Sequence, residues 1–370
     1  LYVGTENGLY VSFDDGEKWE PLQSNLPHAP VYWLVVQEHF NDLVVGTYGR
    51  GFWILDDLTP VQQMNQTVRD ASAHLFPPRP TYRFRPSVVP VTMSDDPSAG
   101  QNPPYGAAIT YYLKTPPTGE VKIRIEDASG KRIRTLNGTK NVGLNRVTWN
   151  LEGESTTEVR MRTSPQFAPD IKLGPDGTRN APGAGRLSIL MPPGTYTVKL
   201  SAGAQTLSQP LIIKKDPNSG GTEADISVQT AMMLDLQKDL ESGAKMVNQI
   251  EFIRSQVEKL DAAVVKSAAD AFNNKLIEIE ENLIQLRLTG QGQDTVRWPP
   301  KLLTKINYLA SGLASGDFGP TKQQREVQAL LKQQLIAVRQ RLDDVLNRDL
   351  PAFNRLLAEK EIRIVIKPSP

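Results

Sequence analysis

The chain has 370 residues, 39% of them hydrophobic and 22% charged, which is ordinary for a globular protein with two or three domains. Its 42 Lys and Arg residues balance 41 Asp and Glu residues, so a net charge of +1 offers little attraction for nucleic-acid phosphates. The absence of cysteine excludes thiol catalysis, disulfide bonds and cysteine-based metal sites. No apolar run reaches the roughly 18–20 residues of a membrane span. We therefore expect neither a nucleic-acid partner nor a membrane span.

Residues 1–76 alternate short apolar runs with Gly and Asp turns, a pattern typical of β-strands. The strand pair at 1–5 and 8–11 recurs at 43–47 and 51–54, an offset of about 42 residues, the length of one propeller blade. The sequence therefore predicts the last one to two blades of a β-propeller over 1–76; a β-sandwich is the alternative. Because the chain opens inside a strand, we expect its natural N-terminus further upstream. The unpaired strand edges then need missing propeller blades or another chain as partner.

A local motif follows the first strand pair. Ser12, Asp14, Gly16 and Trp19 fit the Asp-box pattern S-x-D-x-G-x-T-W, with Lys18 in place of the usual Thr. The Asp side chain can accept hydrogen bonds from the backbone of a tight turn, Gly can adopt a positive φ, and Trp can pack beneath the turn. We interpret these residues as a structural turn on the rim of a blade.

The middle of the chain is expected to contain a linker and a second β domain. Residues 77–104 hold 8 of the 28 prolines and should run extended as a Pro-rich linker. Residues 105–217 alternate again like strands between Gly and Pro turns, which predicts an Ig-like β-sandwich. A Pro- and Gly-rich stretch, 156–186, interrupts this alternation and is expected to be a long inserted loop.

From residue 222 the apolar period changes from 2 to 3.6, which indicates helices. Four amphipathic segments with short connections predict an antiparallel helical bundle over 222–360. Pro351 should end or kink the last helix. The alternation in 362–366 predicts a C-terminal strand over 361–370 that adds to a sheet edge. The expected core positions are Ile226, Met233, Leu236, Leu240, Val247, Ile250, Val257, Leu260, Phe272, Leu276, Ile279, Leu283, Leu286, Leu302, Ile306, Leu309, Leu313, Val327, Leu331, Leu335, Val338, Leu342 and Val345.

Several segments carry a family resemblance. The Asp-box, with GTYGRGFWILDDLTP at 46–60, HLFPPRPTYRF at 74–84 and NPPYGA at 102–107, resembles the C-terminal region of bacterial BNR/Asp-box proteins. These are commonly called glycosyl hydrolases and are related to the sortilin propeller. The resemblance continues through 143–151 and 192–200 and covers essentially the whole chain. It implies a multidomain β and α protein with propeller blades, an Ig/fibronectin-like sandwich and a helical segment. It also implies a secreted, periplasmic or cell-surface location in a bacterium.

The candidate ligand-binding residues are Tyr48, Arg50, Trp53 and Tyr105. Arg50 follows a predicted strand, where a propeller can aim a side chain into its central cleft; a solvated loop arginine is the alternative. Trp53 and Tyr105, like Trp33 and Trp298, could stack on sugars if their rings are exposed, whereas core packing is the alternative.

Catalytic residues cannot be assigned. Asp56 and Asp57 suggest acid–base chemistry, but adjacent strand residues point to opposite faces and cannot flank one glycosidic bond, so we interpret them as strand-end caps. His28, His39 and His74 lack metal-ligand spacing, and no cofactor motif stands in a suitable context, so neither a metal nor a cofactor is expected.

Two functions remain open at this point. The first is a scaffold and binding part of a secreted propeller protein that contacts glycans or proteins. The second is a part of a glycoside hydrolase with its active site in missing N-terminal blades, the chain alone being inactive. The resemblance is to a fold, and a fold does not fix a function.

Overall fold

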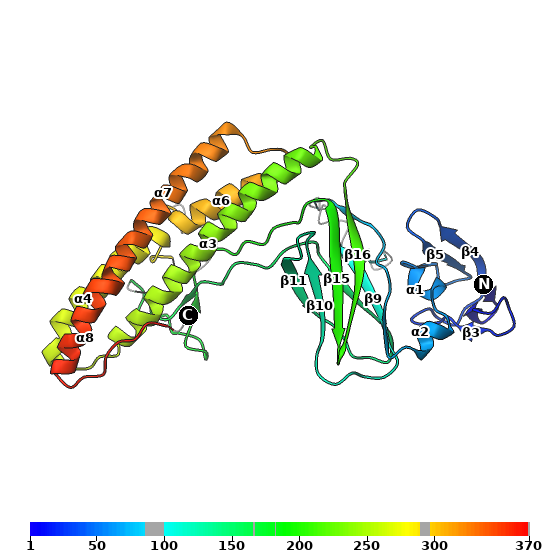
Figure 1. Cartoon of the computed structure of the whole chain (residues 1–370), viewed down its shortest axis with the longest axis horizontal. Helices are drawn as coiled ribbons and strands as arrows, with labels where there is room; N and C mark the ends of the chain where they lie inside the picture. Colours follow the sequence, from blue (N-terminus) through cyan, green and yellow to red (C-terminus); the bar gives the residue numbers. More distant parts are fainter. Residues whose placement is uncertain (86–99, 166, 182, 289–296, 369–370) are drawn as a thin grey trace. The chain divides into compact units, whose positions relative to one another are not determined.

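The computed structural model describes residues 1–370 except 86–99, 166, 182, 289–296 and 369–370, and it confirms a mixture of β and α structure (Figure 1). The chain divides into two compact units, Leu1–Gly153 with Met191–Pro217, and Glu154–Leu190 with Asn218–Pro370. The strands are β1 (Tyr2–Thr5), β2 (Gly8–Val11), β3 (Glu20–Pro21), β4 (Val31–Gln37), β5 (Asp42–Thr47), β6 (Phe52–Leu55), β7 (Ala73–Leu75), β8 (Thr81–Arg83), β9 (Ala107–Leu113), β10 (Val121–Glu126), β11 (Arg132–Asn137), β12 (Gly143–Trp149), β13 (Arg160–Met161), β14 (Arg179–Asn180), β15 (Gly194–Ala202) and β16 (Gln205–Lys215). The helices are α1 (Thr59–Gln62), α2 (Gln66–Asp70), α3 (Glu223–Val257), η2 (Ala263–Val265), α4 (Lys266–Leu283), α6 (Leu302–Leu313), α7 (Lys322–Asp344), η3 (Val345–Asp349) and α8 (Leu350–Glu359).

The first unit begins with two antiparallel sheets of three strands each, β1-β2-β3 and β4-β5-β6. Each contains one of the two strand pairs that repeat in the sequence. Their alternating apolar residues meet in one core, which buries Leu9, Val31, Leu43, Val45 and Leu58. The helices α1 and α2 pack beside these sheets: Val61 contacts their core, and Arg69 forms an ion pair with Glu20 of β3 at 3.0 Å.

Two further sheets complete the first unit. One has five strands in the order β11-β10-β15-β16-β8, and the other has the order β12-β9-β7. All pairings are antiparallel except that of β16 with β8, which is parallel. Trp149 on β12 is fully buried and its ring centroid lies 5.6 Å from that of Tyr196 on β15. The two sheets therefore share a core.

Two boundaries predicted from the sequence differ from the structure. The expected linker 77–104 contains β8, which pairs with β16 from Ile213 onward, and residues 86–99 of that linker lie outside the described residues. Prolines precede β8 but none falls within it, so its backbone N–H groups can join a sheet. The predicted blade region 1–76 contains β7, which pairs with β9 instead of a blade strand.

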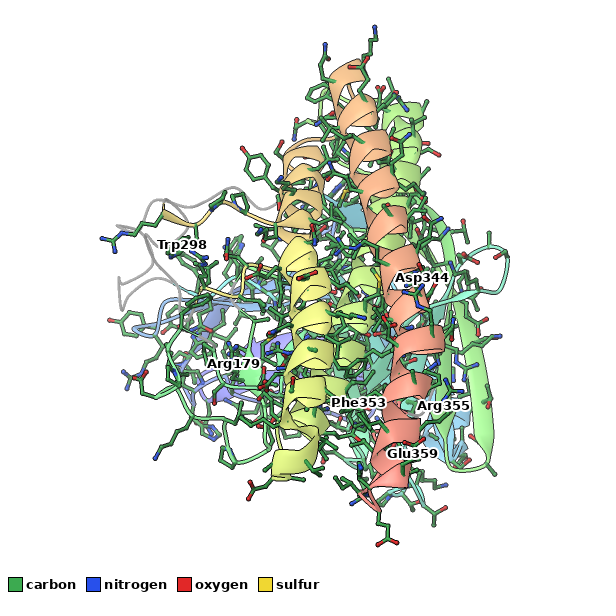
Figure 2. All side chains as sticks on the ribbon, turned by 90° about the vertical axis from the view of Figure 1, so that its left-hand side faces the viewer. Arg179, Trp298, Asp344, Phe353, Arg355 and Glu359 are labelled. Carbon is green, nitrogen blue, oxygen red and sulfur yellow. The ribbon has the colours of Figure 1, made fainter. Side chains whose placement is uncertain are left out.

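The second unit contains the long helices. A rise of about 1.5 Å per residue makes the 35-residue α3 about 52 Å long, whereas α4 and α6 together span about 45 Å. Both α4 and α6 pack against α3 and α7, and they follow one another along the same path (Figure 2). Two short helices together thus match the length of one long helix, a detail that the predicted antiparallel bundle left unspecified.

The segment expected as a loop inserted in the sandwich, 156–186, packs in the second unit instead. Its short hairpin of β13 and β14 pairs Arg160 with Asn180. Asn248 of α3 accepts a hydrogen bond from the Arg160 backbone at 2.9 Å and donates one to the Glu158 carbonyl at 2.9 Å. A polar side chain of α3 therefore binds backbone groups beside this hairpin.

The last helix changes its winding before Pro351. In η3 the chain forms a π-helical turn, in which the Leu350 N–H donates to the Val345 carbonyl five residues earlier. Pro351 then occupies the first turn of α8, directly after this π turn. The expected interruption at Pro351 thus takes the form of a π turn that joins two helices.

The C-terminal segment is extended, but residues 362–368 form no strand, which corrects the strand predicted over 361–370. Two amides take the place of a neighbouring strand. Asn354 exchanges hydrogen bonds with the backbone N–H and carbonyl of Val365 at 2.9 and 2.8 Å, and Gln256 does the same for Ile366 at 3.0 and 2.9 Å. Side-chain amides on α3 and α8 therefore hold this segment.

Candidate functional site

The Asp-box residues form a hydrogen-bonded turn. The Ser12 hydroxyl donates to Asp14 at 2.9 Å and accepts from the Gly16 N–H at 2.8 Å, while Asp14 accepts from the Lys18 N–H at 2.8 Å. Gly16 has φ +101°, a conformation that favours glycine. The Lys18 hydrogen bond is the main cause that lowers the pKa of Asp14. Trp19 remains 41% exposed. The turn stabilises its own backbone.

The predicted ligand-binding residues separate into two places. Tyr48, Arg50 and Trp53 lie on the β5–β6 hairpin, where the Trp53 indole N–H donates to the Arg50 carbonyl at 3.0 Å. Trp53 is partly buried and packs against the core of the first two sheets. Tyr48 is 70% exposed. Tyr105 lies elsewhere, before β9, and its hydroxyl accepts from the Phe84 N–H at 3.1 Å.

The sheet β4-β5-β6 is apolar on both faces. One face carries Leu43, Val45, Trp53 and Leu55 and belongs to the shared core. The opposite face carries Trp33, Val35, Phe52 and Ile54, which are 72%, 45%, 84% and 61% exposed. The register places Trp33 and Phe52 on either side of Gly46, and Val35 and Ile54 on either side of Val44. We call these four residues the uncovered sheet face.

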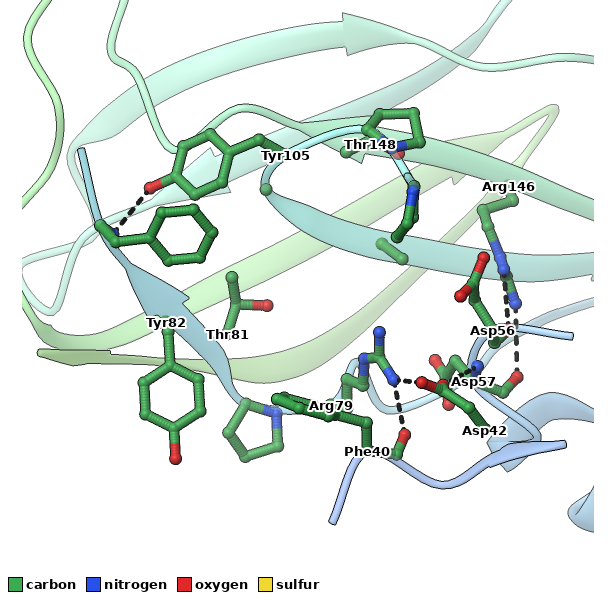
Figure 3. Close-up of a pocket in the computed structure, with 16 residues that line it drawn as sticks. Phe40, Asp42, Asp56, Asp57, Arg79, Thr81, Tyr82, Tyr105, Arg146 and Thr148 are labelled. Carbon is green, nitrogen blue, oxygen red and sulfur yellow. Dashed lines mark hydrogen bonds and ion pairs between the residues drawn. The ribbon is translucent and has the colours of Figure 1, made fainter. Parts of the chain in front are cut away.

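A cavity of about 310 Å³ lies in the first unit (Figure 3). Five separate parts of the chain form it: the β4–β5 turn, the end of β6, the segment around β8, the turn before β9, and β12. It is lined by Phe40, Asp42, Asp56, Asp57, Arg79, Pro80, Thr81, Tyr82, Phe84, Pro103, Pro104, Tyr105, Gly106, Ala108, Arg146 and Thr148.

Arg79 is held on one wall of the cavity. Its guanidinium donates to the Asp42 carboxylate at 2.8 Å and to the Phe40 carbonyl at 2.5 Å. The same Asp42 oxygen accepts from the Asp57 N–H at 2.8 Å, so one carboxylate fixes both the arginine and the turn after β6. The ion pair is three-quarters buried and constrains the shape of this wall.

Arg146 of β12 holds the same turn from the other side. Its guanidinium donates to the backbone carbonyls of Asp56 at 3.0 Å and Asp57 at 3.4 Å, and to the Thr110 hydroxyl at 3.2 Å. The Asp57 carboxylate accepts from the Thr59 N–H at 3.2 Å, a turn contact two residues along the chain. Both arginines of the cavity are therefore engaged with the protein.

Asp56 differs from its neighbours. In Figure 3 the dashed lines from Arg146 end on backbone oxygens, and none reaches the Asp56 carboxylate. Burial and then the nearby Asp42 raise the pKa of Asp56, while Arg146 and Arg79 oppose this shift. Among the residues that the structure describes, its carboxylate accepts no hydrogen bond. Asp56 thus presents an acceptor to the cavity.

Aromatic rings form much of the remaining wall. Phe84 and Tyr105 are in contact with their ring centroids 4.7 Å apart, and Phe40 and Tyr82 are 6.5 Å apart. Phe40 and Phe84 keep 41% and 43% of their surface exposed. The cavity therefore combines apolar ring surfaces with one available carboxylate, a combination typical of small-molecule binding sites.

Of the cavity residues, sequence reasoning named only Tyr105, Asp56 and Asp57. Motif spacing relates residues that are close in the sequence, so it cannot predict a cavity formed by five distant segments. One local pattern was available: Tyr82 and Phe84 are two positions apart, which places both on one side of an extended segment that includes 81–83.

A second group of charged residues is buried in the helical unit. Arg254 donates to Glu251 at 2.7 Å and to Glu280 at 2.6 Å, and all three side chains are at most 4% exposed. Glu251 also accepts from the backbone N–H groups of Arg162 and Thr163 and from the Thr163 hydroxyl. Burial, followed by the charge of Glu251, raises the pKa of Glu280 well above its usual range. This group fastens the 154–190 segment to α3.

Trp298, the remaining aromatic candidate, lies in the second unit with the Arg287 guanidinium 4.3 Å from its ring centroid. Arg287 also lies 4.8 Å from the ring of Phe167, so it stands between two aromatic side chains. One face of Trp298 is therefore occupied by a cation.

No cluster of His, Cys, Asp or Glu suited to a metal ion occurs in the described parts of the chain. Over those same ranges, no helix is both long enough and apolar enough to cross a bilayer. Comparisons with protein-family models and with curated proteins gave no match.

Proposed function

We propose that this chain is the C-terminal scaffold and binding part of a secreted, BNR/Asp-box type β-propeller protein. In this proposal the sheets β1-β2-β3 and β4-β5-β6 are propeller blades, and the two following sheets form an Ig-like sandwich. The helical unit supports this assembly and offers a surface for protein or glycan contacts. The Asp-box turn and the repeat of about 42 residues support the first part of the proposal.

The observation that carries the proposal is the uncovered sheet face. An antiparallel sheet with one face in water normally alternates apolar and polar residues. Here Trp33, Val35, Phe52 and Ile54 make the outward face as apolar as the buried one. Contiguous exposed apolar surface of this kind marks an interaction site. A neighbouring blade, which would pack sheet against sheet, is an occupant with matching chemistry.

Acrylamide quenching of Trp33 fluorescence tests this proposal, with Trp33→Phe used to isolate the Trp33 signal. Trp33 should be quenched readily in this chain alone and should be protected when a segment carrying further copies of the 42-residue repeat is added. Phe52→Ser together with Ile54→Ser should abolish the protection. Tyr308→Ser is the matched control, since Tyr308 is an exposed aromatic residue of the helical unit. Quenching that stays unchanged on addition of the repeats would contradict the proposal.

The resemblance also suggests a second function, glycoside hydrolysis by an active site in further blades. One observation within this chain bears on it. The pKa of Asp56 is raised inside a cavity that holds two other aspartates, and raised carboxyl pKa values are common at catalytic sites. Turnover of aryl-glycosides by this chain that disappears in Asp56→Asn would favour this second function, whereas the scaffold proposal expects no turnover.

A further inference from the structure

The cavity around Asp56 suggests a ligand, independently of the scaffold function. Its volume of about 310 Å³ lies at the lower end of small-molecule sites, which suits one or two sugar rings rather than a folded partner. Its polar groups are held in place by the contacts of Arg79 and Arg146, so the cavity is formed without a ligand.

The charges of the cavity disfavour an anionic ligand. Three aspartates and two arginines line it, which leaves one negative charge in excess when all are ionised. Both guanidinium groups already donate to protein oxygens, and the accessible polar group is the Asp56 carboxylate. A carboxylate, sulfate or phosphate on the ligand would meet repulsion from Asp56.

The same walls disfavour a strongly cationic ligand. Arg79 and Arg146 stand on two sides of the Asp56 turn, and both lower the pKa of Asp56, so their positive fields reach its carboxylate. A ligand cation beside Asp56 would lie within those fields. A neutral hydrogen-bond donor has neither conflict.

The aromatic walls complete the chemical description. Phe84 and Tyr105 on one side and Phe40 and Tyr82 on the other offer ring surface for the C–H face of a ligand. A ligand with an apolar face and outward hydroxyl donors satisfies both the rings and Asp56. We propose that this cavity binds an uncharged sugar, with Asp56 accepting hydrogen bonds from its hydroxyl groups.

Isothermal titration calorimetry of the whole chain tests the proposal with four probes: methyl β-glucoside and cellobiose as neutral sugars, glucuronate as an anion, and choline as a cation. The neutral sugars should bind and the charged probes should bind at least about 10-fold more weakly. Asp56→Ala should weaken neutral-sugar binding by about 10- to 100-fold, as expected for loss of a hydrogen bond to a charged acceptor. Asp56→Asn, which keeps a carbonyl acceptor, should recover part of this loss. Phe84→Ala should weaken binding by about 5-fold or more through loss of ring surface.

Two controls separate binding from folding. Asp70→Asn changes an exposed aspartate of the same unit and should leave affinity unchanged, and each variant should keep the wild-type melting temperature within a few degrees. Tighter binding of glucuronate or choline than of the neutral sugars would overturn the proposal. So would the absence of any neutral-sugar binding, or binding that Asp56→Ala and Phe84→Ala leave unchanged. None of these results bears on the quenching of Trp33, so the scaffold proposal is tested separately.

Discussion

Replacing Arg254 with Met should destabilise the helical unit strongly. Arg254 is 4% exposed and donates to two carboxylates, Glu251 and Glu280, that are fully buried. Met fills a similar volume but leaves both carboxylates without their counter-ion. Breaking a buried ion pair by removing one partner costs about 3–5 kcal/mol, a large part of the ~5–15 kcal/mol that stabilises a typical domain.

Urea unfolding followed by circular dichroism at 222 nm measures this loss, because the helices dominate that signal. The matched control is Arg325→Met on α7, an exposed arginine whose loss should change the free energy of unfolding by less than about 0.5 kcal/mol. An Arg254→Met chain within about 1 kcal/mol of wild type would refute the reasoning, since it would mean that the carboxylates do not depend on Arg254.

The pH dependence of the same group gives a second measurement of it. The pKa of Glu280 is raised in the folded chain by burial and then by Glu251. The favourable contribution of Glu280 to the free energy of unfolding is therefore complete below its unfolded pKa of about 4.3. This contribution is lost as pH rises through its folded pKa. Glu280→Gln cannot ionise, so it should match wild type near pH 4 and be more stable at pH 8. Glu278→Gln, an exposed neighbour on α4, is the control. A destabilised Glu280→Gln at pH 8 would contradict this account.

Three further changes test other parts of the fold. Leu283→Asp should cost about 4 kcal/mol or more in urea unfolding, because it places a charge at a fully buried position of α4; a smaller loss would mean that α4 can turn its stripe outward. Asp14→Ala should lower the melting temperature by removing the acceptor of the Lys18 N–H and leave sugar titrations unchanged. Gly106→Ala should lower the free energy of unfolding by about 2 kcal/mol or more, since φ is +131° and a Cβ would collide with the Trp149 carbonyl; an unchanged melting curve would show that the β9 turn can relax.

The sequence predicted the helices of the second unit well, because their apolar stripes repeat over many turns. Leu240, Ile250, Leu276 and Leu335 are buried as their spacing indicated, whereas Val327, also expected in the core, is 43% exposed. The arrangement of these helices was not predictable in the same way. Whether α4 and α6 lie side by side or follow one another depends on their lengths relative to α3, and helix ends are weakly encoded.

The buried ionic group shows what a stripe analysis can overlook. Arg254 lies four residues after Ile250 and three before Val257, so its spacing is that of a core position. Because it is charged, however, it would be interpreted as a solvent-exposed residue. Glu280 likewise stands four residues after Leu276. Charged residues at stripe positions were the available signal for this group. Their partners, Arg162 and Thr163, come from a distant loop that spacing cannot place.

The cavity was less accessible to prediction than the helices. Asp42, Arg79 and Arg146 acquire their roles from contacts across 37 to 90 residues of chain. The strand β8 was not predicted, because the high proline content of 77–104 indicated a linker. Only the exact positions of the prolines, which lie outside 81–83, are compatible with a strand there. The sequence suggested Asp56 and Asp57 as strand-end caps that point to opposite faces of a strand. In the structure β6 ends at Leu55, both residues line the same cavity, and Asp57 accepts from the Thr59 N–H two residues further along.

The π turn at η3 affects how the last helix tolerates changes in length. From Val338 the buried positions Leu342, Leu346 and Leu350 follow at steps of four residues. At about 100° per residue each such step overshoots a full turn by about 40°, so three steps would rotate the stripe by about 120°. The π turn η3 has more residues per turn than an α-helix, so each residue rotates the chain less and part of this rotation is cancelled. Phe353 then faces Phe272, with their ring centroids 4.9 Å apart. The five residues of η3 thus set the rotation of α8 relative to α7 about their common axis. Deleting one residue there would convert the π turn to ordinary α-helix, whereas inserting one would rotate Phe353 away from its contact with Phe272 of α4.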